Sequence, residues 1–171
     1  MTLFKRFILA LVLAVVLGMP SGIFWTPDTS FDDMQVKYRG GASQFLVLAS
    51  SDRLHYRDQG GSGGEVLIFI HGTSASLHTW EPLIERLGDR YRLISLDLPG
   101  HGLTGANAAR DYSREAMVFS IWSLMDHLSI TAATLVGNAL GGSVAWAAAL
   151  DMPKRVRSLV LLAPSGALNP I

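Results

Sequence analysis

The stretch GNALGG, residues 137–142, decides the fold because of the elements on either side of it. The apolar run TLV at residues 134–136 is typical of a buried strand, and a helix rich in small residues follows the stretch. A glycine-rich turn between such a strand and helix holds its central residue in a strained backbone conformation, and Gly137 and Gly141 let the two elements converge. The central residue is Ala139, whose methyl group cannot act as a nucleophile. A turn selected only for packing is the alternative interpretation.

Strands and helices alternate along the rest of the chain. After an initial hairpin the order is βαβαβαβ, which predicts an α/β domain with a doubly wound, mostly parallel sheet. Ser113 is a suitable N-cap for one of the helices. The expected strands are residues 45–49, 54–58, 66–70, 91–96, 134–136 and 158–163, and the expected helices are residues 78–87, 113–128 and 140–150.

The N-terminus has the pattern of a targeting segment. Lys5 and Arg6 precede an unbroken apolar run over residues 7–17, which predicts a signal anchor or signal peptide at residues 1–25. An uncleaved anchor is favoured, with the globular part outside the cytoplasm, and a buried helix of the globular domain is the alternative. Residues 26–43 are expected to form a polar stalk with a short helix near residues 32–38, and the core is expected at residues 44–171.

Composition excludes several classes of function. The chain has 171 residues, with 14 Lys and Arg against 14 Asp and Glu, so no net positive charge would attract nucleic acid. It contains no cysteine, which excludes disulfides, thiolate catalysis and Cys-based metal sites and leaves the redox compartment open. No cofactor and no metal are expected.

Two further glycine-rich stretches match known motifs but lack their context. GGSGG at residues 60–64 contains a literal G-x-S-x-G, but Ser62 precedes a strand and opens no helix, so it reads as a flexible loop. GHGLTG at residues 100–105 matches a dinucleotide fingerprint, yet no helix begins at its third glycine, and the acidic residue Asp126 falls in an expected helix. Neither stretch is expected to carry chemistry.

Four motifs taken together resemble the α/β-hydrolase superfamily, in particular the branch with H-G, D-x-P-G-x-G and G-N-S-L-G-G. They are LHYRDQG at residues 54–60, HGTSAS at 71–76, DLPGHG at 97–102 and GNALGG at 137–142. The resemblance covers residues 44–167, which is nearly the whole predicted core.

The resemblance implies an oxyanion hole, a pair of N–H groups that stabilises negative charge on a reacting carbonyl oxygen. Its donors would be the backbone N–H of Leu140, after the nucleophile position at Ala139, and that of Thr73. The helix that follows Ala139 adds its N-terminal dipole to the same point. The other residues in the motifs are expected to be structural: His71, Gly72, Asp97, His101, Gly137 and Gly141.

Two departures from the family pattern predict an inactive chain. The first is Ala139 itself. The second is that no histidine follows Ala139, whereas the catalytic triad of this family places an acid and then a histidine after the nucleophile. Asp151 is the only acid after Ala139, at a helix end where a solvated role is expected, and Ser143 lies too far along the helix to replace the nucleophile. All histidines precede position 139: His55, His71, His78, His101 and His127.

In this family a cap domain usually follows the strand that corresponds to residues 158–163, and the strands with the triad acid and histidine come later. The chain stops at PSGALNPI, residues 164–171, so we expect it to be a portion of a longer enzyme whose fold is truncated before the cap.

Three interpretations of function remain open from the sequence. The first is a membrane-anchored or exported serine hydrolase of small, apolar, ester-like substrates, with an acyl-enzyme mechanism and its nucleophile replaced. The second is a non-catalytic α/β-hydrolase-fold protein that binds a ligand or partner. The third is a relative of dehalogenases and epoxide hydrolases, which carry an aspartate nucleophile at the elbow.

Overall fold

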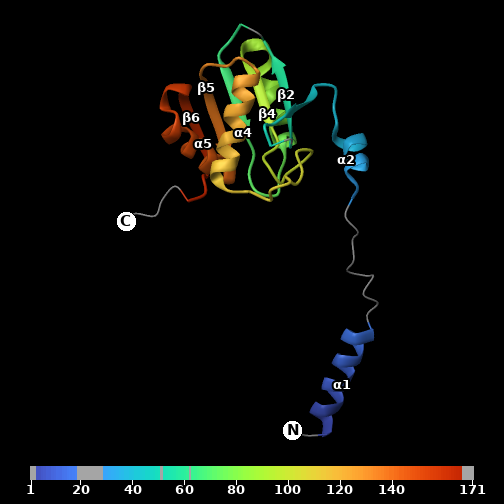
Figure 1. Ribbon diagram of the computed structural model, residues 1–171. Helices are drawn as coiled ribbons and strands as arrows, with labels where there is room; N and C mark the ends of the chain where they lie inside the picture. Colours follow the sequence, from blue (N-terminus) through green and yellow to red (C-terminus); the bar gives the residue numbers. More distant parts are fainter. Residues whose placement is uncertain (1–2, 19–28, 51, 62, 167–171) are drawn as a thin grey trace. The chain divides into compact units, whose positions relative to one another are not determined.

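The computed structural model describes residues 3–18, 29–50, 52–61 and 63–166, which form two compact units, Met1–Asp33 and Met34–Ile171 (Figure 1). Residues 19–25 of the predicted targeting segment and Ser62 lie outside the described residues.

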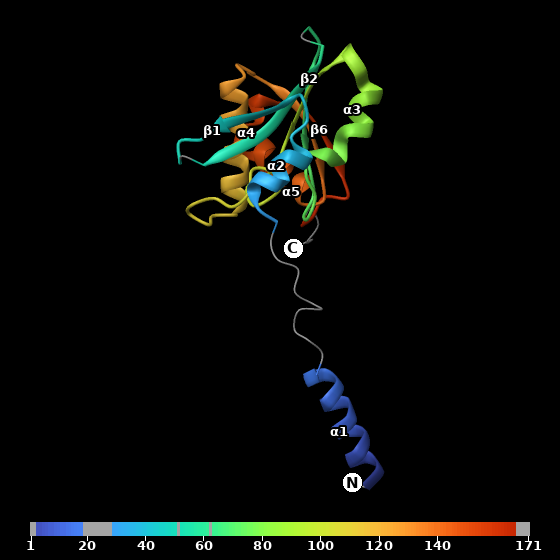
Figure 2. The ribbon, with the colours of Figure 1, turned by 90° about the vertical axis from the view of Figure 1, so that its right-hand side faces the viewer.

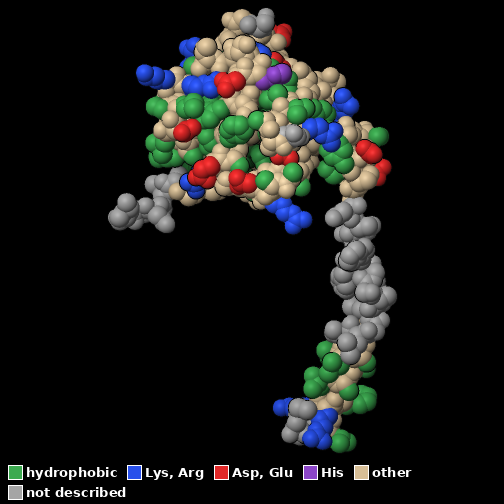
Figure 3. Space-filling view, viewed as in Figure 1, with side chains coloured by type: hydrophobic (Ala, Val, Ile, Leu, Met, Phe, Trp, Pro, Cys, Tyr) green, Lys and Arg blue, Asp and Glu red, His purple; other side chains and the backbone are tan. Residues whose placement is uncertain are grey.

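Helix α1 (Leu3–Gly18) is the regular element of the first unit. Its large apolar side chains are exposed, among them Phe4 and Phe7, and its basic residues lie toward its N-terminal end (Figure 3). Within the described part of the chain, no helix has both the length and the apolar character needed to cross a membrane. The predicted membrane segment therefore stays a prediction.

A short helix, α2 (Phe31–Tyr38), lies where the sequence predicts one. It begins with a reciprocal cap, because the N–H of Asp33 donates to Ser30 Oγ at 3.1 Å and the Ser30 hydroxyl donates to Asp33 Oδ2 at 2.7 Å. The Asp33 carboxylate also lies at the positive end of the helix dipole, which favours this start.

The second unit is built on a six-stranded mixed sheet in the order β1-β2-β4-β3-β5-β6. The pairs β1/β2 and β2/β4 are antiparallel, whereas β3/β4, β3/β5 and β5/β6 are parallel, which confirms the predicted mostly parallel α/β sheet. The strands are β1 (Ser43–Val47), β2 (Arg53–Gly60), β3 (Val66–Ile70), β4 (Arg92–Leu96), β5 (Ala133–Asn138) and β6 (Val156–Leu162).

Apolar side chains cover both faces of the sheet, because alternate residues of a strand point to opposite sides. In β3, Ile68 and Ile70 pack in one cluster with α4 (Arg114–His127) and α5 (Leu140–Asp151). Phe69 points the other way and packs with residues of and before α3 (Glu81–Leu87). Figure 2 shows α3 and α4 on opposite sides of the sheet.

Two predicted elements differ from the observed ones for local reasons. The expected helix 78–87 is divided into a 3₁₀ turn, η2 (Leu77–Trp80), and α3, because Pro82 has no N–H to continue the helical bonding across the junction. The expected strand 45–49 begins at Ser43 and ends at Val47, since the N–H of Leu48 bonds to Asp52 O and starts a turn. The other 3₁₀ turns described are η3 (Gly88–Arg90) and η4 (Pro153–Arg155).

Candidate active site

The strand order places the candidate site between the carboxyl ends of β3 and β5. From β3 the chain moves to β4 on one side, and from β5 it moves to β6 on the other, so the order reverses between these neighbouring strands. Open α/β sheets bind their ligands in the crevice at such a reversal point. The two loops at this position are the one after Ile70, with the H-G motif, and the elbow at Ala139.

Ala139 is held in a backbone conformation that residues with a side chain rarely adopt. Its φ is 46° and its ψ is −111°, between the end of β5 and the first turn of α5. Three backbone hydrogen bonds fix it: its N–H donates to Leu162 O at 3.0 Å, and its carbonyl accepts from Ser143 N at 3.1 Å and Ser165 N at 2.9 Å. Such strain costs about 1–3 kcal/mol, and the surrounding bonds maintain it.

The glycines of the elbow are required by close backbone contacts. A Cβ on Gly137 would overlap the backbone of Gly141, and one on Gly141 would overlap the carbonyl of Ile70 in β3. A Cβ on Gly72 would lie 3.3 Å from the Ala139 methyl carbon and 2.9 Å from Asn138 Oδ1. The H-G loop and the elbow are therefore in direct contact.

The two amides predicted to form an oxyanion hole lie one residue beyond this contact on each side. Leu140 is the first residue of α5, so its N–H has no acceptor within its own helix and points out of the helix N-terminus. Thr73 directly follows Gly72 and is exposed. The two residues therefore belong to the two loops that meet at Ala139, and the α5 dipole favours negative charge at the N-terminus of that helix. Their role as an oxyanion hole stays a prediction.

Asp97 connects the loops behind the crevice. Its Oδ1 accepts the N–H of Leu77 at 2.7 Å, and its Oδ2 accepts the N–H of Leu103 at 2.8 Å. A Cβ on Gly102, whose φ is +47°, would overlap the Asp97 carboxylate. Burial raises the pKa of Asp97, but hydrogen bonds from His55, Leu77 and Leu103 outweigh it and hold the pKa below its usual value.

His55 is a partner of Asp97 that the sequence patterns did not single out. Its Nδ1 lies 2.7 Å from Asp97 Oδ2, and both side chains are buried. The signal available was the antiparallel pairing of β2 with β4, which sets Tyr56 opposite Leu96 and so brings His55 beside Asp97. That register depends on contacts between residues distant in sequence, so no local motif predicts it.

His71 is committed to structural bonds. Its Nε2 accepts the N–H of Leu98 at 3.0 Å, so the network assigns the ring proton to Nδ1, which donates to Gly72 O at 2.7 Å. Burial lowers the pKa of His71 and outweighs the raising effects of the Gly72 carbonyl and Asp97. A neutral His71 with both nitrogens occupied cannot accept a proton at the elbow. The His101 ring packs beside it in a tilted arrangement, with 5.1 Å between ring centroids.

This burial predicts a loss of stability in mild acid. The unfolded chain protonates His71 near pH 6.5, the ordinary value for histidine, whereas the folded chain does so only at lower pH. Between these values the unfolded state binds more protons, so the free energy of unfolding falls as the pH falls below about 6.5. Asp97 adds a second loss at lower pH, as its depressed folded pKa is approached from above.

Urea denaturation at pH 7.5, 6.0 and 5.0 would measure this effect. We expect a decreasing midpoint in the wild type, and a smaller decrease from pH 7.5 to 5.0 in His71→Gln, which cannot bind the proton. A midpoint that rises toward pH 5.0 in the wild type would contradict the assignment of a neutral, buried His71.

The contacts of Asp151 and Ser143 are structural and place neither residue as a nucleophile or a base. The Asp151 carboxylate accepts the Trp122 indole N–H at 2.9 Å, a specific bond where the sequence predicts only a solvated helix end. Ser143 lies inside α5, largely buried, and its N–H closes the first helical bond to Ala139 O.

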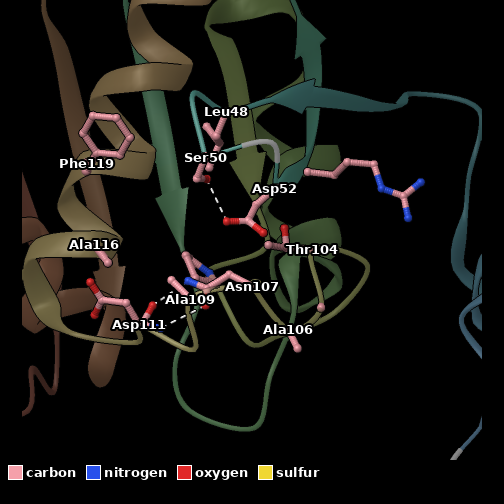
Figure 4. Close-up of a pocket in the computed structure, with 13 residues that line it drawn as sticks. Leu48, Ser50, Asp52, Thr104, Ala106, Asn107, Ala109, Asp111, Ala116 and Phe119 are labelled. Carbon is pink, nitrogen blue, oxygen red and sulfur yellow. Dashed lines mark hydrogen bonds between the residues drawn. The ribbon is translucent and has the colours of Figure 1, made fainter.

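A separate pocket of about 210 Å³ lies beside the turn between β1 and β2, and Figure 4 shows its lining. Its wall is largely apolar and includes Leu48 and Phe119. Ser50 at its edge donates to Asp52 Oδ2 at 2.7 Å, drawn as a dashed line, and Asp52 Oδ1 accepts Ala108 N–H at 2.9 Å. Of the 97–102 motif, Pro99 contributes to this wall.

The mixed sheet, the elbow at its reversal point and the H-G loop against it define the class of α/β-hydrolase-fold proteins. The sequence profile of the family described as "alpha/beta hydrolase fold" matches residues 65–170. The chain belongs to this family.

Several of the similar proteins are hydrolases. The chain is 34% identical over 128 residues to 2-hydroxymuconate semialdehyde hydrolase of Pseudomonas sp. (strain CF600), covering 73% of this chain and 44% of the relative. It is 36% identical over 139 residues to the dihydrolipoyllysine-residue acetyltransferase component of the acetoin cleaving system of Cupriavidus necator. That match covers 81% of this chain and 36% of the relative.

Among solved structures, a serine-to-alanine mutant of the meta-cleavage product hydrolase of Pseudomonas fluorescens IP01, complexed with acetates, superposes with a TM-score of 0.67. It is 33% identical, over 75% of this chain and 47% of that one. The chain thus spans between about a third and a half of the length of these relatives.

Proposed function

We propose that the crevice between β3 and β5 is an acyl-binding site, and that the parent activity of this protein is serine-type hydrolysis of a small, apolar, ester-like substrate. The observation that carries the proposal is the strained backbone of Ala139, with φ 46° and ψ −111°, maintained beside Gly72. A backbone of this kind presents a side chain to a ligand over a helix N-terminus, and packing alone does not require it.

The parent mechanism follows from this arrangement. A serine hydroxyl at position 139 would attack the ester carbon, with its proton passing to a histidine and then to the leaving alcohol. The N–H groups of Leu140 and Thr73 would stabilise the negative charge on the carbonyl oxygen. Water would then release the acid from the acyl-enzyme. In this chain the alanine stops the first step, so we expect binding without turnover.

Two observations support this proposal. The relative complexed with acetates carries alanine in place of a serine, and acetate is the product of hydrolysis of an acetyl ester. In this chain Leu140 begins α5 directly after Ala139, and Thr73 follows Gly72, which lies against the elbow, so their amides are the candidate donors for a carboxylate oxygen. The carboxylate charge also matches the positive end of α5.

The binding of acetate to the chain as it stands tests the proposal. An ideal ligand of four non-hydrogen atoms gains at most about 6 kcal/mol, a Kd of roughly 40 µM, so a Kd in the millimolar range is expected. Backbone amide shifts would be followed by NMR during titration with sodium acetate, with sodium chloride at equal ionic strength as control. We expect the largest saturable shifts at Leu140 and Thr73.

Gly72→Ala provides the matched variant. Its added methyl would approach the Ala139 methyl carbon to 3.3 Å, so it narrows the crevice and should weaken acetate binding by about tenfold or more, which corresponds to about 1.4 kcal/mol. Saturable shifts confined to other residues, or equal binding by Gly72→Ala, would show that the crevice is not an acyl site.

A further inference from the structure

A second serine is placed beside a histidine and an aspartate, away from the elbow. Ser43, the first residue of β1, has its Oγ 2.8 Å from His55 Nε2, and His55 Nδ1 lies 2.7 Å from Asp97 Oδ2. The three side chains come from β1, β2 and the end of β4, so the antiparallel part of the sheet brings them together. We call them the Ser43 relay.

The hydrogen-bond acceptors of the Ser43 relay determine where its protons lie. Asp97 also accepts the N–H groups of Leu77 and Leu103, so its carboxylate is an acceptor and His55 Nδ1 is the donor. Arg57 Nε donates to Ser43 Oγ at 3.4 Å, which leaves the hydroxyl hydrogen to point at His55 Nε2. This is the orientation in which a histidine activates a serine.

The histidine of the relay is more deeply buried than the serine. His55 is fully buried, and its backbone N–H donates to Thr104 Oγ1 at 2.9 Å. The Phe45 ring packs against the imidazole with 5.0 Å between ring centroids. Ser43 is only partly buried, and its own N–H is bonded to Gly40 O at 3.0 Å, which fixes the turn before β1. The Arg57 guanidinium, which is ion-paired with Glu81 at 2.6 Å, lies on the other side of the Ser43 hydroxyl from His55 and holds its oxygen in place.

We propose that Ser43 is a nucleophile activated by His55 and Asp97, and that it accepts acyl or phosphonyl groups from small activated reagents. The site is independent of position 139 and therefore goes beyond the proposed function. The predicted chemistry is stoichiometric transfer, without turnover.

The reaction of Ser43 with an alkyl fluorophosphonate would be a substitution at phosphorus. Ser43 Oγ attacks phosphorus, an O–P bond forms, the P–F bond breaks and fluoride leaves. The hydroxyl proton passes to His55 Nε2 and from there to water. An activated acyl ester reacts in the same way, with the proton delivered to the departing alkoxide.

Labelling of the wild-type chain with a fluorophosphonate, followed by peptide mass spectrometry, tests the proposal. Residue 139 is alanine, so no label can arise at the elbow, and failure of the acetate experiment leaves this one unaffected. We expect a single label at Ser43, its loss in Ser43→Ala, and none at Ser50, whose hydroxyl bonds to a carboxylate without a histidine. In His55→Gln the labelling rate should fall by about 100-fold, the lower range for loss of a general base.

A second pair of variants keeps His55 in place, in case its replacement disturbs folding. The chain has no cysteine, so Ser43→Cys and Ser50→Cys each introduce one thiol. At pH 6.0 a free thiol is almost entirely protonated, whereas a thiol beside His55 is expected to form its thiolate. We expect alkylation by iodoacetamide to be at least about tenfold faster in Ser43→Cys than in Ser50→Cys.

Three results would overturn the proposal. They are no fluorophosphonate label at Ser43 under conditions that label an active serine hydrolase, unchanged labelling in a folded His55→Gln, and equal alkylation rates in the two cysteine variants. Each would show that the relay only supports the sheet.

Discussion

Replacing Ala139 with serine is expected to raise kcat/KM for short acyl esters by about 10⁶, the loss seen when a catalytic serine is removed from a hydrolase. The reason is that the substitution adds one oxygen to a backbone already in the elbow conformation, next to the amides that we propose as the oxyanion hole. The measurement is the hydrolysis of p-nitrophenyl esters of two to six carbons by the purified variant.

We expect the full gain only in a form of the protein that supplies a histidine to the elbow, because a serine needs a histidine to take its proton. No histidine follows Ala139 in this sequence, and both nitrogens of His71 are occupied. The same substitution in the 171-residue chain is the control, and we expect a gain smaller by about 10³ or more there.

Ala139→Asp separates the remaining interpretations. Activity of this variant on epoxides or haloalkanes, with none on esters for Ala139→Ser, would place the parent with the aspartate-nucleophile enzymes. If neither variant gains activity while acetate still binds, the protein is a ligand-binding member of the family that does not catalyse.

Gly141→Ala is expected to lower stability by about 3 kcal/mol or more, equivalent to a fall in Tm of roughly 6 to 12 °C. The added Cβ would overlap the Ile70 carbonyl, a backbone atom at the end of β3 that cannot turn aside as a side chain can. Helix α5 would have to move away from the sheet, and the cluster around Val144 and Ala145 would open.

Gly41→Ala is the matched control, since a Cβ there would have no heavy atom within 4 Å, and we expect a change within about 0.5 kcal/mol. Both variants would be compared by thermal unfolding followed by circular dichroism. Equal Tm values for Gly141→Ala and the wild type would mean that α5 does not pack on β3 as closely as described.

The sheet was predictable because its signals are local. Runs such as VLIFI in β3 are apolar on both faces, so they mark a central strand without knowledge of the partners. The elbow was predictable for the same reason, since glycine spacing reports close backbone approach. The start of α3 was not, because Pro82 decides it within a run that otherwise favours a helix.

The Ser43 relay was not predictable from local patterns. Ser43 falls at the end of the segment assigned to a polar stalk, residues 26–43, whereas the structure makes it the first residue of β1. Its contact with His55 depends on the β1/β2 register, in which Phe45 lies opposite His55, and the contact with Asp97 depends on β2 and β4. Two separate pairings over long sequence distances are needed to assemble the relay.

The conformation of Ala139 has one further consequence. Glycine adopts a positive φ more readily than alanine does, so a position with no use for a side chain would gain stability from glycine. The chain instead keeps a Cβ at φ 46°, where it lies beside Gly72. The methyl group thus keeps a carbon at the point from which, under the proposed function, a serine hydroxyl would extend.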